Sequence, residues 1–99
     1  MATFFISRHS GAQEWAVREG YEGAKVVTHA GDDFFDGLEP GDLVLGTLPV
    51  QLAEQVCSVG AEYHHLELSI PAELRGKELT AEMMTELGAT LTRFHITRG

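Results

Sequence analysis

A serine, an arginine and a histidine stand side by side near the N-terminus and carry the groups that phosphate chemistry uses. Arg8 can hold a phosphate through two parallel hydrogen bonds, and His9 can exchange a proton near neutral pH. Ser7 adds a hydroxyl beside them. The structural alternative is that Arg8 pairs with a surface carboxylate such as Glu14 while His9 only caps a helix.

A second candidate segment is the run Gly46-Thr47-Leu48-Pro49. Its glycine lets the backbone come close to a ligand, and Thr47 places a hydroxyl at the start of the next helix. The same residues would also form an ordinary tight turn in which Thr47 is the helix cap. Arg75, in a short basic turn further along the chain, could complete a phosphate site, although a solvated turn explains it equally well.

Four side chains allow a metal site to be considered, namely His29, Asp32, Asp33 and Asp36. They would supply hard oxygen ligands and one imidazole. Acidic residues in loops are more often helix caps and solvated charge. The sequence therefore predicts no metal and no other cofactor.

Three further aromatic side chains have structural interpretations. His64 and His65 are neighbours in a predicted strand, so they point to opposite faces and cannot bind one ion together. We expect one of them in the core and one at the surface. Trp15 is expected in the core, although an aromatic ring in the first turns of a helix could stack on a base.

Hydrophobic patterns place the candidate residues where strands end and helices begin. The continuous apolar run at 3–6 is typical of a strand buried on both faces of a parallel sheet. The other predicted strands span 24–29, 42–45, 63–70 and 90–97, and the predicted helices begin at Ser10, Pro49 and Thr80 and end at Gly20, Gly60 and Gly88. Segment 30–41 holds either a short helix at 33–38 or an irregular lid.

The first predicted helix has a start that would favour an anion. Ser10 and Gln13 have the spacing of a capping box, in which the Ser10 hydroxyl accepts from the backbone and Gln13 reaches back. The free N–H groups in this turn, which includes Gly11, lie at the positive end of the helix dipole.

Alternation of strands and helices predicts an α/β fold: one Rossmann-like domain over residues 1–99, with helices on both faces of a mostly parallel five-stranded sheet. The simplest strand order is the flavodoxin-like 2-1-3-4-5. Ligands of such sheets bind at the carboxyl ends of the strands, where the order reverses between the first and third strands. Topology therefore selects the loops at 7–9 and 46–48.

Composition limits the partners. Fifteen acidic residues against seven basic ones give a net charge of −8, which makes binding of long nucleic acid improbable but leaves room for a small phosphorylated ligand. No signal peptide or membrane span is expected, and the single cysteine, Cys57, is expected as a buried thiol in a reducing compartment. We therefore predict a cytoplasmic protein. A core this thin would gain from pairing with a second copy.

The segments FFISRHSGAQEW, GDLVLGTLPVQLAEQVCSVGAEYHHLELSIP and RGKELTAEMM resemble the Csx-sixteen family of small type III CRISPR accessory proteins. The resemblance covers most of the chain and both selected loops. That family is associated with stand-alone ring nucleases, so the resemblance implies cleavage of cyclic oligoadenylate, chiefly cyclic tetra-adenylate. It supplies no assigned catalytic residue.

Physical chemistry makes such an activity feasible without a metal. The 2′-hydroxyl of each adenosine can attack its own 3′-phosphate, leaving a 2′,3′-cyclic phosphate and linear di-adenylate. Arg8 would stabilise the charge, His9 would act as general acid or base, and Ser7 or Thr47 would position the ribose or phosphate. A two-fold symmetric homodimer would match the two-fold symmetry of the ring.

Two other functions remain open at this point. The first is a non-catalytic protein that sequesters or senses the same messenger through the same loops. The second is an unrelated nucleotide-binding module, which would prefer a mononucleotide to the ring.

Overall fold

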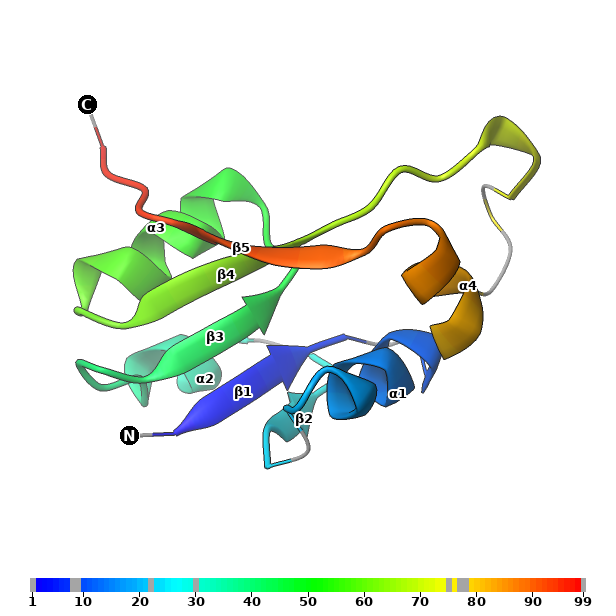
Figure 1. Ribbon diagram of the computed structural model, residues 1–99. Helices are drawn as coiled ribbons and strands as arrows, with labels where there is room; N and C mark the ends of the chain where they lie inside the picture. The colour runs from blue at the N-terminus through cyan, green and yellow to red at the C-terminus, as the bar shows by residue number, and fades with distance from the viewer. Residues whose placement is uncertain are drawn as a thin grey trace.

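The computed structural model describes residues 2–7, 10–21, 23–29, 31–74, 76 and 79–98 (Figure 1). The elements are, in chain order, β1 (Thr3–Ile6), α1 (Ser10–Arg18), β2 (Lys25–Val27), α2 (Asp32–Asp36), β3 (Leu43–Gly46), α3 (Val50–Ser58), β4 (Glu62–Glu67), the short 3-10 helix η1 (Ala72–Leu74), α4 (Ala81–Glu86) and β5 (Thr90–Phe94).

The five strands form a single sheet in the order β2-β1-β3-β4-β5. Strand β1 is parallel to β2 and β3, and β3 is parallel to β4, whereas β5 is antiparallel to β4. This confirms the predicted mostly parallel α/β sheet and its strand order. The point at which the order reverses lies between β1 and β3, as the sequence predicts.

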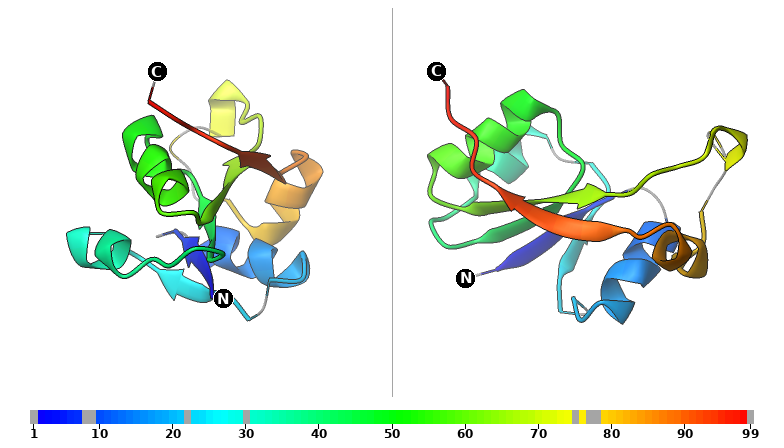
Figure 2. Two further views of the ribbon diagram at one scale, coloured as in Figure 1. Left: turned by 90° about the vertical axis from the view of Figure 1, so that its left-hand side faces the viewer. Right: turned by 45° about the horizontal axis from the view of Figure 1, so that its top comes forward.

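Helices cover both faces of the sheet, with α1 and α4 on one face and α2 and α3 on the other (Figure 2). The cluster on the α1 and α4 face contains Phe5, Leu45, Leu66, Trp15 and Met84. The cluster on the α2 and α3 face contains Val44, Tyr63, Val56, Cys57 and, at its margin, Phe34. Because β1 and β3 have helices on both sides, their side chains are apolar at successive positions, which explains the continuous apolar runs.

Segment 30–41 contains the short helix that the sequence allowed, but the helix begins one residue earlier and ends two residues earlier than expected. It is α2, which ends where the Gly37 N–H donates to the carbonyl oxygens of Asp33 and Phe34. Phe34 and Phe35 pack against the core cluster of the α2 and α3 face. The segment is therefore part of the fold on that face.

Three strands are shorter than predicted. Strand β2 spans Lys25–Val27 instead of 24–29. Strand β4 ends at Glu67 instead of residue 70, and the chain beyond it lines a cavity described below. Strand β5 ends at Phe94 instead of residue 97, because the Ile96 N–H turns toward Sγ of Cys57, 3.4 Å away. Cys57 is buried, as predicted.

No helix in the ranges that the structure describes has the length and apolar character needed to cross a lipid bilayer.

Candidate functional site

The carboxyl ends of three strands meet at one edge of the sheet. In the parallel register Ile6 of β1 pairs with Gly46 of β3, and Gly46 pairs with His65 of β4. A cavity of about 520 Å³ opens at this edge, and its lining comes from these strands, from α1 and from α4. Ser7 and Thr47 contribute hydroxyl groups to an otherwise mostly apolar wall. Ser7 and Thr47, one from each of the two loops selected from the sequence, therefore meet at one cavity.

Seven of the predicted site residues fall into three groups. Ser7, Gly46 and Thr47 line the cavity. Leu48 is partly buried beside it, and its backbone N–H is fixed by Tyr63. Arg8, His9 and Arg75 lie outside the described residues, so their predicted roles stay predictions.

Trp15 belongs to the core and not to the cavity wall. Its side chain is only 1% exposed, within the cluster between α1 and the sheet. A ring this deeply buried has almost no face left on which a base could stack. The structure therefore confirms the expectation that Trp15 is a core residue and gives no support to base stacking on it.

The start of α1 differs from the predicted capping box. Ser10 is the first residue of the helix rather than its cap, and its side chain is exposed. Gln13 does reach back, but its side-chain amide donates to the backbone carbonyl oxygen of Ser7, 3.1 Å away. This bond ties the first turn of α1 to the residue that follows β1. The consequence is that Gln13 helps to fix Ser7 at the cavity.

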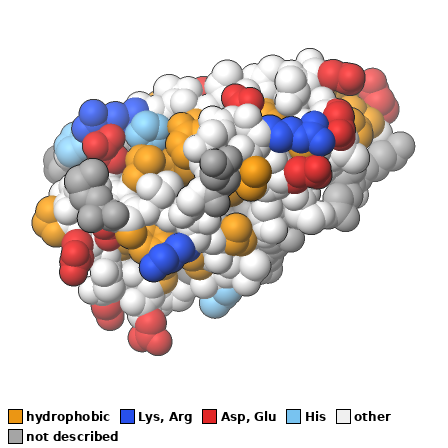
Figure 3. All heavy atoms as spheres, turned by 60° about the horizontal axis from the view of Figure 1, so that its bottom comes forward, with side chains coloured by type: hydrophobic (Ala, Val, Ile, Leu, Met, Phe, Trp, Pro, Cys, Tyr) orange, Lys and Arg blue, Asp and Glu red, His pale blue; other side chains and the backbone are white. Residues whose placement is uncertain are grey.

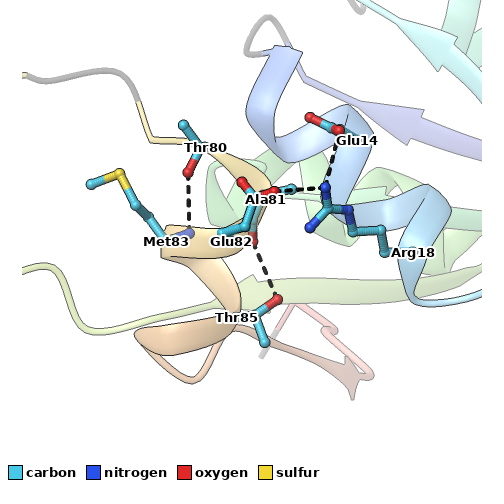
Figure 4. Close-up of polar contacts among 7 residues, drawn as sticks. All are labelled: Glu14, Arg18, Thr80, Ala81, Glu82, Met83 and Thr85. Carbon is cyan, nitrogen blue, oxygen red and sulfur yellow. Dashed lines mark hydrogen bonds and ion pairs between the residues drawn. The ribbon is translucent and has the colours of Figure 1, made fainter.

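Gly11 lets the same helix start approach α4. Its Cα lies so close to the chain before α4 that an added Cβ would be 1.8 Å from the carbonyl oxygen of Leu79. Further along, Arg18 of α1 donates to Glu82 of α4 at 2.8 Å and to Glu14 of its own helix at 3.2 Å (Figure 4). These carboxylates raise the pKa of Arg18, with Glu82 the larger influence. The α1 and α4 wall of the cavity is thus held at two points.

Gly46 is required by its backbone. Its φ is +151°, and an added Cβ would lie 2.7 Å from the carbonyl oxygen of Ile6. A side chain here would push β1 and β3 apart at the cavity edge. The sequence predicted that this glycine would let the backbone approach a ligand, whereas the close approach in the structure is to Ile6 of β1.

Tyr63 is a member of the site that the sequence interpretation missed. Its buried hydroxyl accepts a hydrogen bond from the Leu48 N–H at 2.8 Å and donates to the Gly46 carbonyl oxygen at 3.1 Å. It also lies 2.7 Å from Nδ1 of His65. Burial raises the pKa of Tyr63, so the phenol is neutral at physiological pH. Tyr63 therefore clamps the backbone on both sides of Thr47.

His65 lines a second recess of about 540 Å³, which shares Thr47, Leu66 and Leu68 with the first cavity. His64 has its own partner, Glu62, at 3.4 Å. The two histidines thus have separate partners. Both imidazoles are partly buried, so the expected division into one core and one surface histidine is wrong. The spacing of Tyr63 and His65 could have indicated that they contact each other, because residues i and i+2 of a strand share a face.

Among the described residues that line the cavity and the recess, one has an acidic side chain, Glu67. On the face shown in Figure 3, Lys and Arg side chains form separate groups among acidic and hydrophobic ones. Within the part of the chain that the structure describes, no three His, Cys, Asp or Glu side chains are grouped so that they could hold a metal ion. The polar groups that the described residues bring to the cavity and the recess are hydroxyls, the His65 imidazole, the Glu67 carboxylate and backbone groups.

Comparison with known proteins gives one match. Residues 4–97 match the model of a protein family described as "Putative CRISPR-associated protein (Cas_VVA1548)". Nothing among the curated proteins or the solved structures matches the chain. The family match spans nearly the whole chain and includes every element that forms the cavity. The protein belongs to this CRISPR-associated family.

Proposed function

We propose that this protein is a ring nuclease of the Csx-sixteen type, an enzyme that binds and cleaves the cyclic oligoadenylate messenger of type III CRISPR systems, chiefly cyclic tetra-adenylate. The observation that carries the proposal is the cavity at the carboxyl ends of β1, β3 and β4 in a chain of a CRISPR-associated family. Ligands of parallel sheets bind at this edge. A nucleotide messenger is a ligand that such a cavity suits.

The lining of the cavity supports a nucleoside as the bound group. Its apolar wall includes the partly exposed side chains of Leu68, Ile70 and Leu79 and is suited to the faces of an adenine. The hydroxyls of Ser7 and Thr47 lie where a ribose or phosphate could accept or donate hydrogen bonds. The combination of an apolar wall with a few polar groups is typical of small-molecule sites.

In the proposed reaction the ring supplies its own nucleophile. The 2′-hydroxyl attacks the adjacent phosphorus, and the bond from phosphorus to the 5′-oxygen breaks, giving linear di-adenylate with a 2′,3′-cyclic phosphate. Arg8 stabilises the charge on the phosphate, and His9 acts as general acid or base. Ser7 and Thr47 orient the ribose and phosphate for in-line attack. This step needs no metal ion.

Further contacts come from both sides of the cavity. The backbone of Ser10 and Gly11 at the start of α1 suits an anion, although Gly11 is itself packed against Leu79. The turn at Gly46 and Leu48 borders the opposite side. Arg75, which lies outside the described residues, is proposed to add a cation. Trp15 has no part in this site because it is buried in the core.

We also propose a homodimer in which the site lies at the two-fold axis, because a ring with two-fold symmetry is best matched by two copies of the same loops. Two copies would double the cations at the site and so offset the acidic net charge. Light scattering coupled to size-exclusion chromatography, with and without the ring, tests this. A mass of one chain under both conditions would contradict it.

The test of the reaction is incubation of the purified protein with cyclic tetra-adenylate in EDTA, followed by chromatography of the products. Wild type should give linear di-adenylate ending in a cyclic phosphate, and His9→Ala and Arg8→Ala should lose this activity. Arg98→Ala is the matched control, because it removes a cation paired with Glu54 of α3, and neither residue lines the cavity. Tight binding with the ring left intact, even after addition of manganese, would instead establish a non-catalytic messenger-binding protein.

A further inference from the structure

The Tyr63 hydroxyl faces three polar groups but has a single hydrogen. The Leu48 N–H donates to it at 2.8 Å, while the Gly46 carbonyl oxygen at 3.1 Å can only accept. Nδ1 of His65, at 2.7 Å, could take either role. A hydroxyl can donate one hydrogen bond and accept two. The arrangement that satisfies all three contacts has the hydroxyl donating to Gly46 and accepting from both Leu48 and His65.

This arrangement fixes the tautomer of His65. Nδ1 carries the hydrogen, so in the neutral imidazole Nε2 has the free lone pair and is basic. The ring is also held in orientation by edge contacts with Tyr63 and Phe94, at centroid distances of 5.8 and 6.1 Å. No hydrogen bond from the described residues reaches Nε2. A histidine oriented through Nδ1 and open at Nε2 is arranged as general bases are.

The position of His65 connects it to the cavity. The recess that it lines and the cavity at Ser7 meet at Thr47, so a ligand large enough to fill both would pass Thr47 with one part on each side. A cyclic oligonucleotide has that size. Two ionisable groups lie near the His65 imidazole among the described residues. Glu67 lines the same recess, and the Tyr63 hydroxyl contacts the imidazole directly.

We propose that His65 is a further catalytic residue of this site, whose Nε2 is the general base that takes the proton from the attacking 2′-hydroxyl. This inference rests on the proposed ring nuclease function. As the proton moves to Nε2, the 2′-oxygen bonds to phosphorus, the bond from phosphorus to the 5′-oxygen breaks, and the 5′-oxygen takes a proton from His9. His65 then releases its proton to water and His9 takes one up, so the step balances. Tyr63 is the positioning residue that holds Nδ1.

The first variant for the test is His65→Asn. Its side-chain amide can occupy the place of Nδ1 and keep the contact with Tyr63, but it has no basic nitrogen at the place of Nε2. Cleavage of cyclic tetra-adenylate should fall by about 10²- to 10⁴-fold in kcat, the usual contribution of general acid–base catalysis, with little change in KM. His64→Asn is the matched control: it changes a neighbouring histidine whose partner is Glu62, and it should keep the wild-type kcat.

The second measurement separates catalysis from structure. His65→Ala should recover part of its kcat when free imidazole is added, because the recess that the side chain leaves can hold the base. Tyr63→Phe should keep His65 but shift the acidic limb of the profile of kcat/KM against pH, because Nδ1 loses its acceptor. A purely structural role of His65 would give neither imidazole rescue nor a shifted profile.

The outcomes distinguish the two proposals. A wild-type protein that leaves the ring intact overturns the ring nuclease function and the base role together. A wild type that cleaves the ring, with His65→Asn retaining its kcat and pH profile, overturns only the role of His65. The role of His65 as general base is established if His65→Asn loses kcat but keeps a normal thermal melt, and if imidazole rescues His65→Ala.

Discussion

The carbonyl oxygen of Leu79 occupies the space into which a side chain at Gly11 would project: a Cβ on Gly11 would lie 1.8 Å from it. Two segments far apart in the chain, the first turn of α1 and the residues before α4, are thereby brought together as one wall of the cavity. The geometry of that wall depends on the absence of one methyl group.

Gly11→Ala should therefore destabilise the protein, by about 1–3 kcal/mol as for other overpacked sites, because backbone rather than a flexible side chain must give way. Denaturant unfolding followed by circular dichroism measures this. Gly23→Ala is the matched control, since a Cβ at Gly23 would meet no atom within 4 Å. Equal stability of the two variants would show that α1 and α4 can separate without cost.

Arg18→Met should have only a small, salt-dependent effect on the melting temperature. The guanidinium bridges α4 and α1 through Glu82 and Glu14, but both ion pairs are exposed, and exposed pairs contribute little. The methionine keeps the apolar part of the side chain and removes the charge. Melts of both proteins at low and at molar salt measure the difference, which should vanish at high salt because the charges are screened. A large difference that persists there would contradict this account.

Acid should destabilise the protein partly through Asp42. The side chain is buried and accepts hydrogen bonds from the N–H groups of Ala2 at 2.9 Å and Glu39 at 3.0 Å, which hold its pKa below the ordinary value of 3.8. A lowered pKa in the folded state stabilises the fold at pH values above 3.8, and this stabilisation is lost as the pH falls through the folded pKa.

Asp42→Asn should therefore lower the free energy of unfolding at neutral pH. The difference in this free energy between the variant and wild type should become smaller as the pH approaches 2. Urea unfolding at several pH values between 7 and 2 measures the two curves. Asp36→Asn removes the same charge from an exposed position of α2 and controls for net charge. A constant difference between wild type and Asp42→Asn at every pH would show that ionisation of Asp42 is not linked to folding.

The thiol of Cys57 should react slowly with a thiol reagent in the folded protein and rapidly in denaturant. It is 8% exposed and lies 3.7 Å from the Phe94 carbonyl oxygen and 3.4 Å from the Ile96 nitrogen. Modification must wait until the segment after β5 detaches or the chain unfolds. Absorbance of the released reagent measures the rate, and immediate reaction in native buffer would contradict this packing.

The strand order could be predicted from the sequence, and so could the position of Ser7, Gly46 and Thr47 at the ends of their strands, because local patterns determine where strands end. Continuous apolar runs occur where the sheet is covered on both faces, and the glycines end the helices where expected. The extent of β4 could not be predicted in this way. Leu66, Leu68 and Ile70 alternate as strand residues do, but only Leu66 belongs to the strand. Leu68 and Ile70 line the cavity, and a cavity wall requires apolar residues just as a sheet face does.

The role of Tyr63 and His65 was missed for a different reason. A pair of adjacent histidines on a strand gives no indication of their partners, because those partners depend on which loop the strand passes. Here the Tyr63 hydroxyl meets Gly46 and Leu48, which belong to a neighbouring strand and the loop after it. Contacts between strands are set by sheet register, which local sequence does not encode.

The antiparallel direction of β5 has a practical consequence. Strand β5 begins at Thr90, opposite Glu67 at the cavity edge, and ends at Phe94, opposite Tyr63. Strand β1 starts from the same far end of the sheet, so the two ends of the chain leave the molecule on the side away from the cavity (Figure 1). An affinity tag, a fluorophore or a linker to a sensor surface can therefore be attached at either end and still leave the mouth of the cavity open.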